Sequence, residues 1–216
     1  MSELPVAYQI LIWSVPVLFA VTLHEVGHGY AAMLLGDSTA KDMGRLSLNP
    51  LKHIDPVGTI VVPLLTFFLS GFIFGWAKPV PVNWNQLRNT KRDIALVALA
   101  GPAANLLMIA FWLLIAKLFI ASGDKGNMLA ALVTMMAWAG IVINSLLMIL
   151  NLFPLPPLDG SRVVYSLLPE PFATRYAKIE PYGLIILVLL LVSGVLFKII
   201  GPLISGFQQA MYTLII

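Results

Sequence analysis

The sequence predicts an all-α integral membrane protein, a polytopic helical bundle of four to five spans with a re-entrant segment and short membrane-edge β-strands. Of its 216 residues, 59% are hydrophobic and 11% are charged, and the mean hydropathy is +0.92. Apolar runs long enough to cross a bilayer, about 20 residues each, take up most of the chain. We therefore expect a single domain over 1–216, with a catalytic core over 8–168 and a C-terminal helix and tail over 180–216.

Five apolar runs are candidate spans, and an apolar tail follows them: 8–35, 57–76, 93–122, 128–153 and 183–200, then 203–216. Residues 1–10 contain no Lys or Arg, so we do not expect a cleavable signal peptide. The absence of cysteine excludes disulfides, thiolate metal ligands and a cysteine nucleophile. The net charge of +3 indicates biased loops and gives no sign of nucleic-acid binding.

The strongest functional signal is the sequence His-Glu-Val-Gly-His at 24–28, inside the first apolar run. Side chains four residues apart share a helix face, so His24 and His28 can present two imidazoles to one metal ion. Glu25 can then reach a metal-bound water as a general base. The alternative, structural histidines in the core, needs neither this spacing nor the glutamate. Because ionisable groups in a span are usually functional, the motif predicts a zinc hydrolase within the membrane.

A catalytic zinc usually takes three protein ligands and leaves a fourth position for water. The best candidate for the third ligand is Asp159, which follows the apolar run 128–150 in Asn-Leu-Phe-Pro-Leu-Pro-Pro-Leu-Asp-Gly. The prolines of this segment would stop a helix and open the backbone. The alternative is a proline turn in which Asp159 caps a helix that starts near Ser161.

Several blocks of the sequence resemble the site-2 protease family of intramembrane zinc metalloproteases. The first is His-Glu-x-Gly-His in an early transmembrane helix, and the last is Asn-x-x-Pro-x-Pro-x-Leu-Asp-Gly late in the chain. Between them lie Gly-Arg-Leu-Ser-Leu-Asn-Pro, Leu-Lys-His-Ile-Asp-Pro-Val-Gly-Thr, Gly-Trp-Ala-Lys-Pro-Val-Pro-Val-Asn and Gly-Pro-Ala-Ala-Asn. The blocks lie within 22–162, and the chain looks like the short branch of the family, without PDZ or CBS domains.

The resemblance implies one Zn²⁺ per chain, held by His24, His28 and Asp159, with Glu25 as the base that activates water. Asn151 matches a family asparagine that faces the scissile carbonyl. An amide donor at that place would stabilise a developing oxyanion, a role worth about 2.7–4 kcal/mol. The alternative is that the amide satisfies backbone carbonyls freed by the prolines.

Two other blocks supply less defined candidates. Short family members carry a histidine at the place of His53, which could gate water, bind the metal in a resting state or contact substrate. The alternative is an interfacial loop histidine that is hydrogen-bonded to backbone. Gly101 and Asn105 lie where small and amide residues let helices pack closely in lipid, so we interpret them as structural or substrate-adjacent.

The basic residues favour a re-entrant path for 57–76. If this run crosses the membrane, the Lys and Arg residues divide almost evenly and the positive-inside rule decides nothing. If it enters and returns, every Lys and Arg except Lys117, Lys125 and Lys198 lies on one side. Pro63 in the middle of the run favours the return, since irregular backbone is tolerated where it lines a protein cavity. A tilted or partial span with the same endpoints is the alternative.

The ligand set gives the same topology. The histidines lie in the later half of 8–35, and Asp159 follows 128–153, so these two helices must run in the same direction for the ligands to meet. We therefore expect four full spans in the cell membrane, an external N-terminus and an active site toward the cytoplasmic side.

Two loop segments have the pattern of short strands, and either could add a substrate peptide at its edge. Residues 44–49 alternate in polarity, and the proline pattern of 78–83 is typical of extended backbone. Because helical amides shield a scissile carbonyl, a transmembrane substrate must unwind, and edge pairing would hold it. The alternative is a surface turn without substrate contact. The candidate substrate-binding residues are Lys78, Pro79, Val80, Pro81 and Asn83.

These expectations combine into a zinc metalloendopeptidase that hydrolyses a peptide bond in or near a transmembrane segment. Its expected partners are a transmembrane protein or peptide substrate, the lipid bilayer and a regulatory membrane partner. One alternative is a metal-ion transporter, because histidines and acids in spans also mark ion pathways. Another is an inactive homologue retained as a binding scaffold in the membrane.

Overall fold

The structure of the chain is a computed structural model that describes residues 4–70, 75–121 and 127–215. The described residues form helices and connecting loops, which confirms the all-helical class. In chain order the elements are α1 (Val6–Leu35), α2 (Thr39–Asp42), η1 (Pro50–His53), η2 (Pro56–Val61), α3 (Val62–Ser70), η3 (Trp84–Gln86), α4 (Thr90–Ala121), α5 (Met128–Asn151), α6 (Asp159–Leu167), α7 (Phe172–Ala177), α8 (Glu180–Val192) and α9 (Val195–Ile215).

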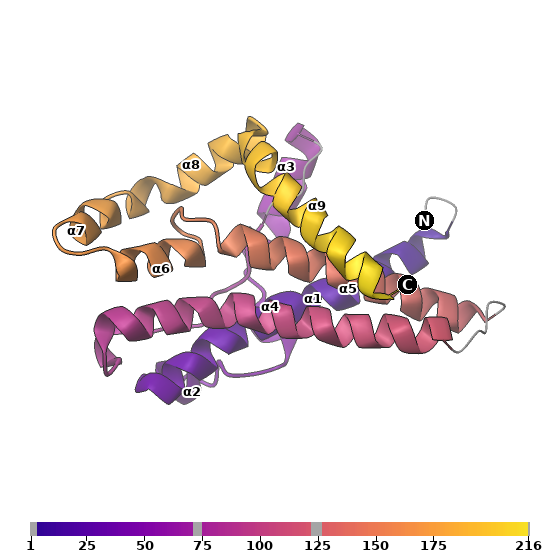
Figure 1. Cartoon of the computed structure of the whole chain (residues 1–216), viewed down its shortest axis with the longest axis horizontal. Coiled ribbons are helices and arrows are strands. Elements are labelled where there is room, and N and C mark those ends of the chain that lie inside the picture. Colours follow the sequence, from indigo (N-terminus) through magenta and orange to yellow (C-terminus); the bar gives the residue numbers. More distant parts are fainter. Residues whose placement is uncertain (1–3, 71–74, 122–126, 216) are drawn as a thin grey trace.

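Helices α1, α4 and α5 form the core, and each of them packs against the other two. In the described part of the chain, these are the three single helices long and apolar enough to cross a membrane. Helices α1 and α5 run in the same direction and α4 runs in the opposite direction, as the colours of Figure 1 show. The end of α1 and the end of α5 therefore lie at the same end of the core, as the proposed ligand set requires.

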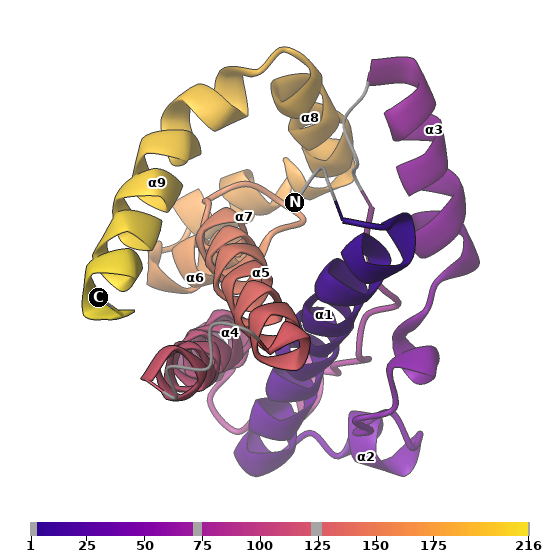
Figure 2. The same cartoon turned by 90° about the vertical axis from the view of Figure 1, so that its right-hand side faces the viewer.

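The run 183–200, predicted as one span, forms parts of two helices. The helix is interrupted at Ser193 and Gly194, and Gly194 has a left-handed φ of +72° that favours glycine. Helices α8 and α9 meet there at 76°, so a fourth span exists only if this bent pair counts as one. Helix α9 packs on α5, and Figure 2 shows α9 and α3 at opposite sides of the core. The predicted number of four full spans is therefore not confirmed.

The run 57–76 leaves the core and returns to its starting point. Its helical part, η2 and α3, ends at Ser70, and residues 71–74 lie outside the described residues. The backbone N–H of Trp76 donates to the carbonyl of Gly58 at 3.0 Å, and the Thr59 hydroxyl donates to the carbonyl of Trp76 at 3.0 Å. The two ends of the excursion are thus hydrogen-bonded to each other, which is the path a re-entrant segment requires.

Helix α4 begins where α1 ends. The backbone N–H of Arg88 donates to the carbonyl of Leu35 at 3.1 Å. The connection over 36–89, including the excursion, therefore starts and finishes at one end of the core. This arrangement gives α1 and α5 their common direction.

The short strands expected at 44–49 and 78–83 are not found among the described residues. The second segment is extended, as its prolines predict, but it has no ladder of backbone hydrogen bonds. Its two prolines have no N–H group. The N–H groups of Val80 and Asn83 donate instead to carboxylates of α1 and of the loop after it.

Asp37 ties this extended segment to the end of α1. Its side chain is fully buried and accepts hydrogen bonds from the N–H and hydroxyl of Thr39 and from the N–H of Asn83, the last at 2.7 Å. Burial raises the pKa of the Asp37 carboxyl, but these hydrogen bonds outweigh burial and hold the pKa below its usual value. The ionised carboxylate therefore stabilises the folded loop.

Candidate metal centre

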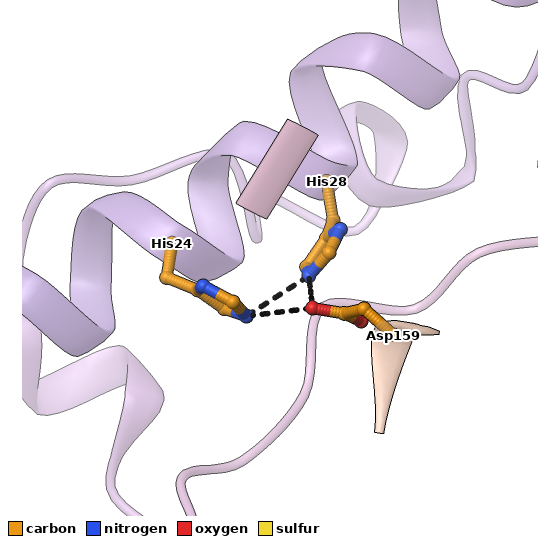
Figure 3. A group of neighbouring side chains, drawn as sticks. All are labelled: His24, His28 and Asp159. Carbon is orange, nitrogen blue, oxygen red and sulfur yellow. Dashed lines mark hydrogen bonds and ion pairs between the residues drawn. The ribbon is translucent and has the colours of Figure 1, made fainter. Parts of the chain in front are cut away.

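Three side chains converge between α1 and the start of α6 (Figure 3). The Oδ2 atom of Asp159 lies 3.2 Å from Nε2 of His24 and 3.3 Å from Nε2 of His28. The two Nε2 atoms are 3.1 Å apart. Three donor atoms that all lie within 4.8 Å of one another can share one metal ion. Across the described ranges of the chain, this is the group of His, Cys, Asp and Glu residues with that property.

Asp159 is the first residue of α6, and it enters the cluster because the prolines after Asn151 end α5. Helix α6 has no side-chain hydrogen bond at its cap, so Asp159 does not serve as the capping residue of the proline-turn alternative. Its Oδ2 atom is buried and makes no hydrogen bond within the described part of the chain. A buried carboxylate oxygen beside two imidazole nitrogens needs a cation between them, and this donor set fits Zn²⁺.

The other ring nitrogen of each histidine is held by an oxygen atom. His24 Nδ1 lies 2.7 Å from Oδ1 of Asn105, and His28 Nδ1 lies 2.7 Å from the carbonyl oxygen of Val97. Both oxygens can only accept, so each Nδ1 carries the hydrogen and donates it. Each Nε2 then presents its lone pair to Asp159 and to the metal position, as in histidine ligands of zinc proteins.

Gly101 gives the two rings room against α4. A Cβ atom at this position would lie 2.4 Å from Nε2 of His28 and 2.7 Å from Cε1 of His24. On α1, a Cβ atom at Gly27 would lie 2.9 Å from the carbonyl oxygen of Ala100. The close crossing of α1 and α4 thus depends on small residues on both helices, and it brings the backbone of α4 directly onto the ligands.

Glu25 lies beside the cluster and is oriented by the extended segment. The N–H of Val80 donates to Oε2 of Glu25 at 2.8 Å. The Glu25 side chain lines a cavity of about 780 Å³ together with the three candidate ligands. A volume of this size is typical of ligand-binding sites in proteins. The cavity walls come from α1, the segment after Gly75, η3, α4, α5, the loop before α6, α6 and α8.

Curated proteins similar to this chain agree with a zinc site. The chain is 37% identical to "Putative zinc metalloprotease YwhC" of Bacillus subtilis over 93% of this chain and 89% of the relative. It is 32% identical to "Putative zinc metalloprotease Rip2" of Mycolicibacterium smegmatis, over 83% of this chain and 66% of that relative. It is 27% identical to Rip2 of Mycobacterium tuberculosis over the same shares. This chain belongs to the site-2 protease family.

No family model and no solved structure matches the chain. The metalloprotease relatives identify Zn²⁺ as the cofactor of this family member, and the donor set of two imidazoles and one carboxylate fits it. His24, His28 and Asp159 are the residues that would hold the ion.

The other predicted residues of this site-2 protease family member divide between the cavity and its surroundings. Asn151 lines the cavity, and its amide nitrogen donates to the carbonyl of Leu147 at 3.0 Å. One of its two N–H groups thus bonds to a carbonyl one turn earlier in α5, which the prolines do not free, so this bond does not correspond to the alternative of an amide that satisfies carbonyls freed by the prolines. Pro79 and Val80 also line the cavity. The predicted substrate-binding residues that are not among the lining residues are Lys78, Pro81 and Asn83.

The structure does not bring His53 to the metal centre. Its ring is buried at the end of η1, where Nε2 lies 2.9 Å from the carbonyl oxygen of Ser47. His53 is neither a member of the ligand cluster nor one of the residues that line the cavity. This position corresponds to the alternative of a loop histidine bound to backbone.

Two residues near the metal centre were missed by sequence reasoning. Asn105, interpreted from the sequence as structural or substrate-adjacent, is the hydrogen-bond partner of His24, a role that was not predicted. Arg162 lines the cavity, lies 5.3 Å above the Trp84 ring and forms an ion pair with Glu180 at the start of α8. Its one sequence signal is its position three residues after Asp159, on the same face of α6.

Proposed function

We propose that the chain is an intramembrane zinc metalloprotease that hydrolyses a peptide bond in or near a transmembrane segment. The observation that carries this proposal is the position of Glu25. Its carboxylate lines the same cavity as the three candidate ligands, in a core of helices long and apolar enough for a membrane. The names of the metalloprotease relatives support the hydrolytic class of the reaction.

In this mechanism, His24, His28 and Asp159 would hold the Zn²⁺ ion, which when bound would lower the pKa of a water molecule to about 7 and polarise the scissile carbonyl. Glu25 removes the proton from the attacking water and returns it to the leaving amine. The N–H of Val80 orients the carboxylate for both transfers. The side-chain amide of Asn151 has two N–H groups. One donates to the carbonyl of Leu147, and the second can donate to the developing oxyanion.

The extended segment is the proposed place of the substrate backbone. Pro79 and Val80 line the cavity that Glu25 and the three candidate ligands also line, so an unwound peptide lying beside these two residues would be within the cavity of the base and the ligands. Leu184 and Leu187 of α8 line the same cavity. We therefore propose that a transmembrane substrate enters beside α8 and that a membrane partner regulates this entry.

The proposed location is the cell membrane, with several spans, an external N-terminus and the active site toward the cytoplasm. Three basic residues support this orientation: Lys41 in α2, Arg162 in α6 and Arg175 in α7. Figure 1 places α2, α6 and α7 at the end of the core where α1 and α5 finish. The positive-inside rule assigns such an end to the cytoplasm.

The substitution Glu25→Gln tests the proposed function. It removes the proton acceptor and keeps the ligands, so zinc stays bound while the cleavage rate falls by about 10²–10⁴-fold, the usual contribution of a general base. Zinc content is measured on purified protein, and cleavage is measured by quantitative proteomics of membranes from cells that express either form. Substrates should accumulate uncut in the variant cells.

Glu170→Gln is the matched control, because it removes an exposed carboxylate of the loop between α6 and α7 and should change neither readout. Cleavage by Glu25→Gln at the rate of the unchanged chain would refute the proposed base. Purified protein without zinc would favour the inactive scaffold instead.

A further inference from the structure

A chain of two buried amides leads from the core of α5 to a zinc ligand. The side chains of Asn105 on α4 and Asn144 on α5 are fully buried. The Asn105 amide nitrogen donates to Oδ1 of Asn144 at 2.9 Å and to the carbonyl of Ala20 at 3.2 Å. The Asn144 amide nitrogen donates to the carbonyl of Gly140 at 2.8 Å. The oxygen of Asn105, Oδ1, lies 2.7 Å from Nδ1 of His24 and accepts a hydrogen bond from it.

The direction of each hydrogen bond follows from the two backbone carbonyls. The carbonyl of Gly140 can only accept, so the NH₂ group of Asn144 faces it and the oxygen of Asn144 faces Asn105. Asn105 then meets two acceptors, Asn144 and Ala20, and its NH₂ group must lie toward them. Its oxygen is left to face His24, so Nδ1 of His24 must be the protonated nitrogen.

We infer that Asn105 and Asn144 are positioning residues for His24, which select the imidazole tautomer whose Nε2 lone pair faces the metal. An Asn105 amide rotated by a half turn would place NH₂ against Nδ1 and would favour the wrong tautomer. Asn144 opposes this rotation together with the carbonyl of Ala20, and it makes the shorter of the two hydrogen bonds, although it is not the hydrogen-bond partner of the histidine. His28 needs no such chain, because the carbonyl of Val97 holds it directly.

This inference concerns how zinc is retained and does not depend on the proposed cleavage of transmembrane segments. Partners of histidine ligands typically change metal affinity by about 10–100-fold when they are removed. We therefore expect Asn105→Leu to weaken zinc binding by about this factor. Asn144→Leu should weaken it in the same direction, through loss of the fixed amide orientation. Competition with a coloured chelator measures zinc affinity in detergent-solubilised protein.

The double variant Asn105→Leu with Asn144→Leu separates positioning from stability. The double variant removes the hydrogen bond between the two amides without leaving either of them unpaired, and the remaining loss is the acceptor of His24 Nδ1, so it should lose less stability than the two single variants together. Its zinc affinity should equal that of Asn105→Leu alone, because Asn144 acts only through Asn105. The absorption spectrum of bound Co²⁺, which reports ligand geometry, should change in the same variants.

Two further variants complete the design. Asn144→Asp should retain zinc affinity, because a buried neutral carboxyl group offers the same acceptor to Asn105 and a donor to Gly140. Ser145→Ala is the matched control, since Ser145 is equally buried on α5 and donates only to the carbonyl of Ile141 in its own helix. A double variant that binds zinc as tightly as the unchanged chain would overturn the inference. Unchanged affinity in Asn144→Leu would overturn the role of Asn144.

Discussion

At the scale of single residues, Asp37 shows how a carboxylate outside the metal centre supports it. Asp37 holds Asn83 at one end of the extended segment, and Glu25 holds Val80 three residues earlier. Two carboxylates, on α1 and directly after it, therefore fix the segment that passes the cavity. Loss of either hydrogen bond would loosen the wall against which Glu25 is oriented.

The substitution Asp37→Asn should lower the stability of the metal-free protein by about 1–3 kcal/mol at neutral pH, because an NH₂ group replaces one of the two carboxylate oxygens and its N–H partner loses an acceptor. The folded Asp37 has a pKa below 3.8, so its contribution is complete above that value. As pH falls below 3.8, the unfolded carboxyl takes up a proton first and the contribution disappears. Thermal unfolding of both forms across this range measures the difference.

Asp42→Asn provides the control, because Asp42 is an exposed carboxylate on α2. This variant should unfold close to the temperature of the unchanged chain at neutral pH. A stability difference for Asp37→Asn that stayed constant down to pH 3 would contradict the assigned role of its ionised form.

At the scale of elements, the sequence predicted the long helices well and their interruptions poorly. Helices α1, α4 and α5 follow continuous apolar runs, so their ends agree within a few residues with 8–35, 93–122 and 128–153. The break at Gly194 has no proline to mark it, and glycine is common inside spans. The amides of Val80 and Asn83 bond to carboxylates distant in sequence, which no local pattern reports.

The candidate site shows the same division. The spacing in the sequence is enough to identify His24, Glu25 and His28 as site residues, because they lie within about one turn of a single helix. The contact of Asn105 with His24 depends on how α4 crosses α1, and the pattern of α4 reports only that small and amide residues occur there. A residue pair that meets through a helix crossing needs the structure.

The substitution Gly101→Ala on α4 tests that crossing. Alanine favours a helix by about 1 kcal/mol over glycine, so the helix itself should gain stability. The added Cβ would nevertheless meet the His28 ring at 2.4 Å, so the rings must move and zinc content should fall. Zinc content and circular dichroism are measured together on the purified variant. Ala103→Leu, at an exposed position of α4, should leave both unchanged.

At the scale of the whole molecule, the metal centre joins parts of the chain far apart in sequence. His24 and His28 come from α1, and Asp159 follows α5, so bound zinc links the first core helix to the segment after the third. A bound cation would neutralise the buried carboxylate of Asp159 and accept the lone pairs of the two imidazoles beside it. Zinc should therefore stabilise the assembled core as well as supply the chemistry.

Removal of zinc by a chelator should lower the unfolding temperature. Free zinc at one hundred times its dissociation constant contributes about 2.7 kcal/mol, and this contribution should return when zinc is added back. His53→Gln should respond like the unchanged chain, because His53 lies outside the cluster. His28→Gln should show a much smaller zinc response. Equal zinc responses of these two variants would contradict the ligand assignment.

The hydrogen bond between Arg88 and Leu35 also bears on how the chain is made. It closes the connection over 36–89 at one end of the core, so in the proposed orientation α1 and α4 would enter the bilayer as a hairpin whose connecting loop stays in the cytoplasm. In that orientation, the link from Ala121 to Met128 would be the connection between α1 and α5 that passes through the membrane during biosynthesis. Few charged side chains would then have to be carried across the membrane between α1 and α5, although the folded core encloses the polar cluster of His24, His28 and Asp159.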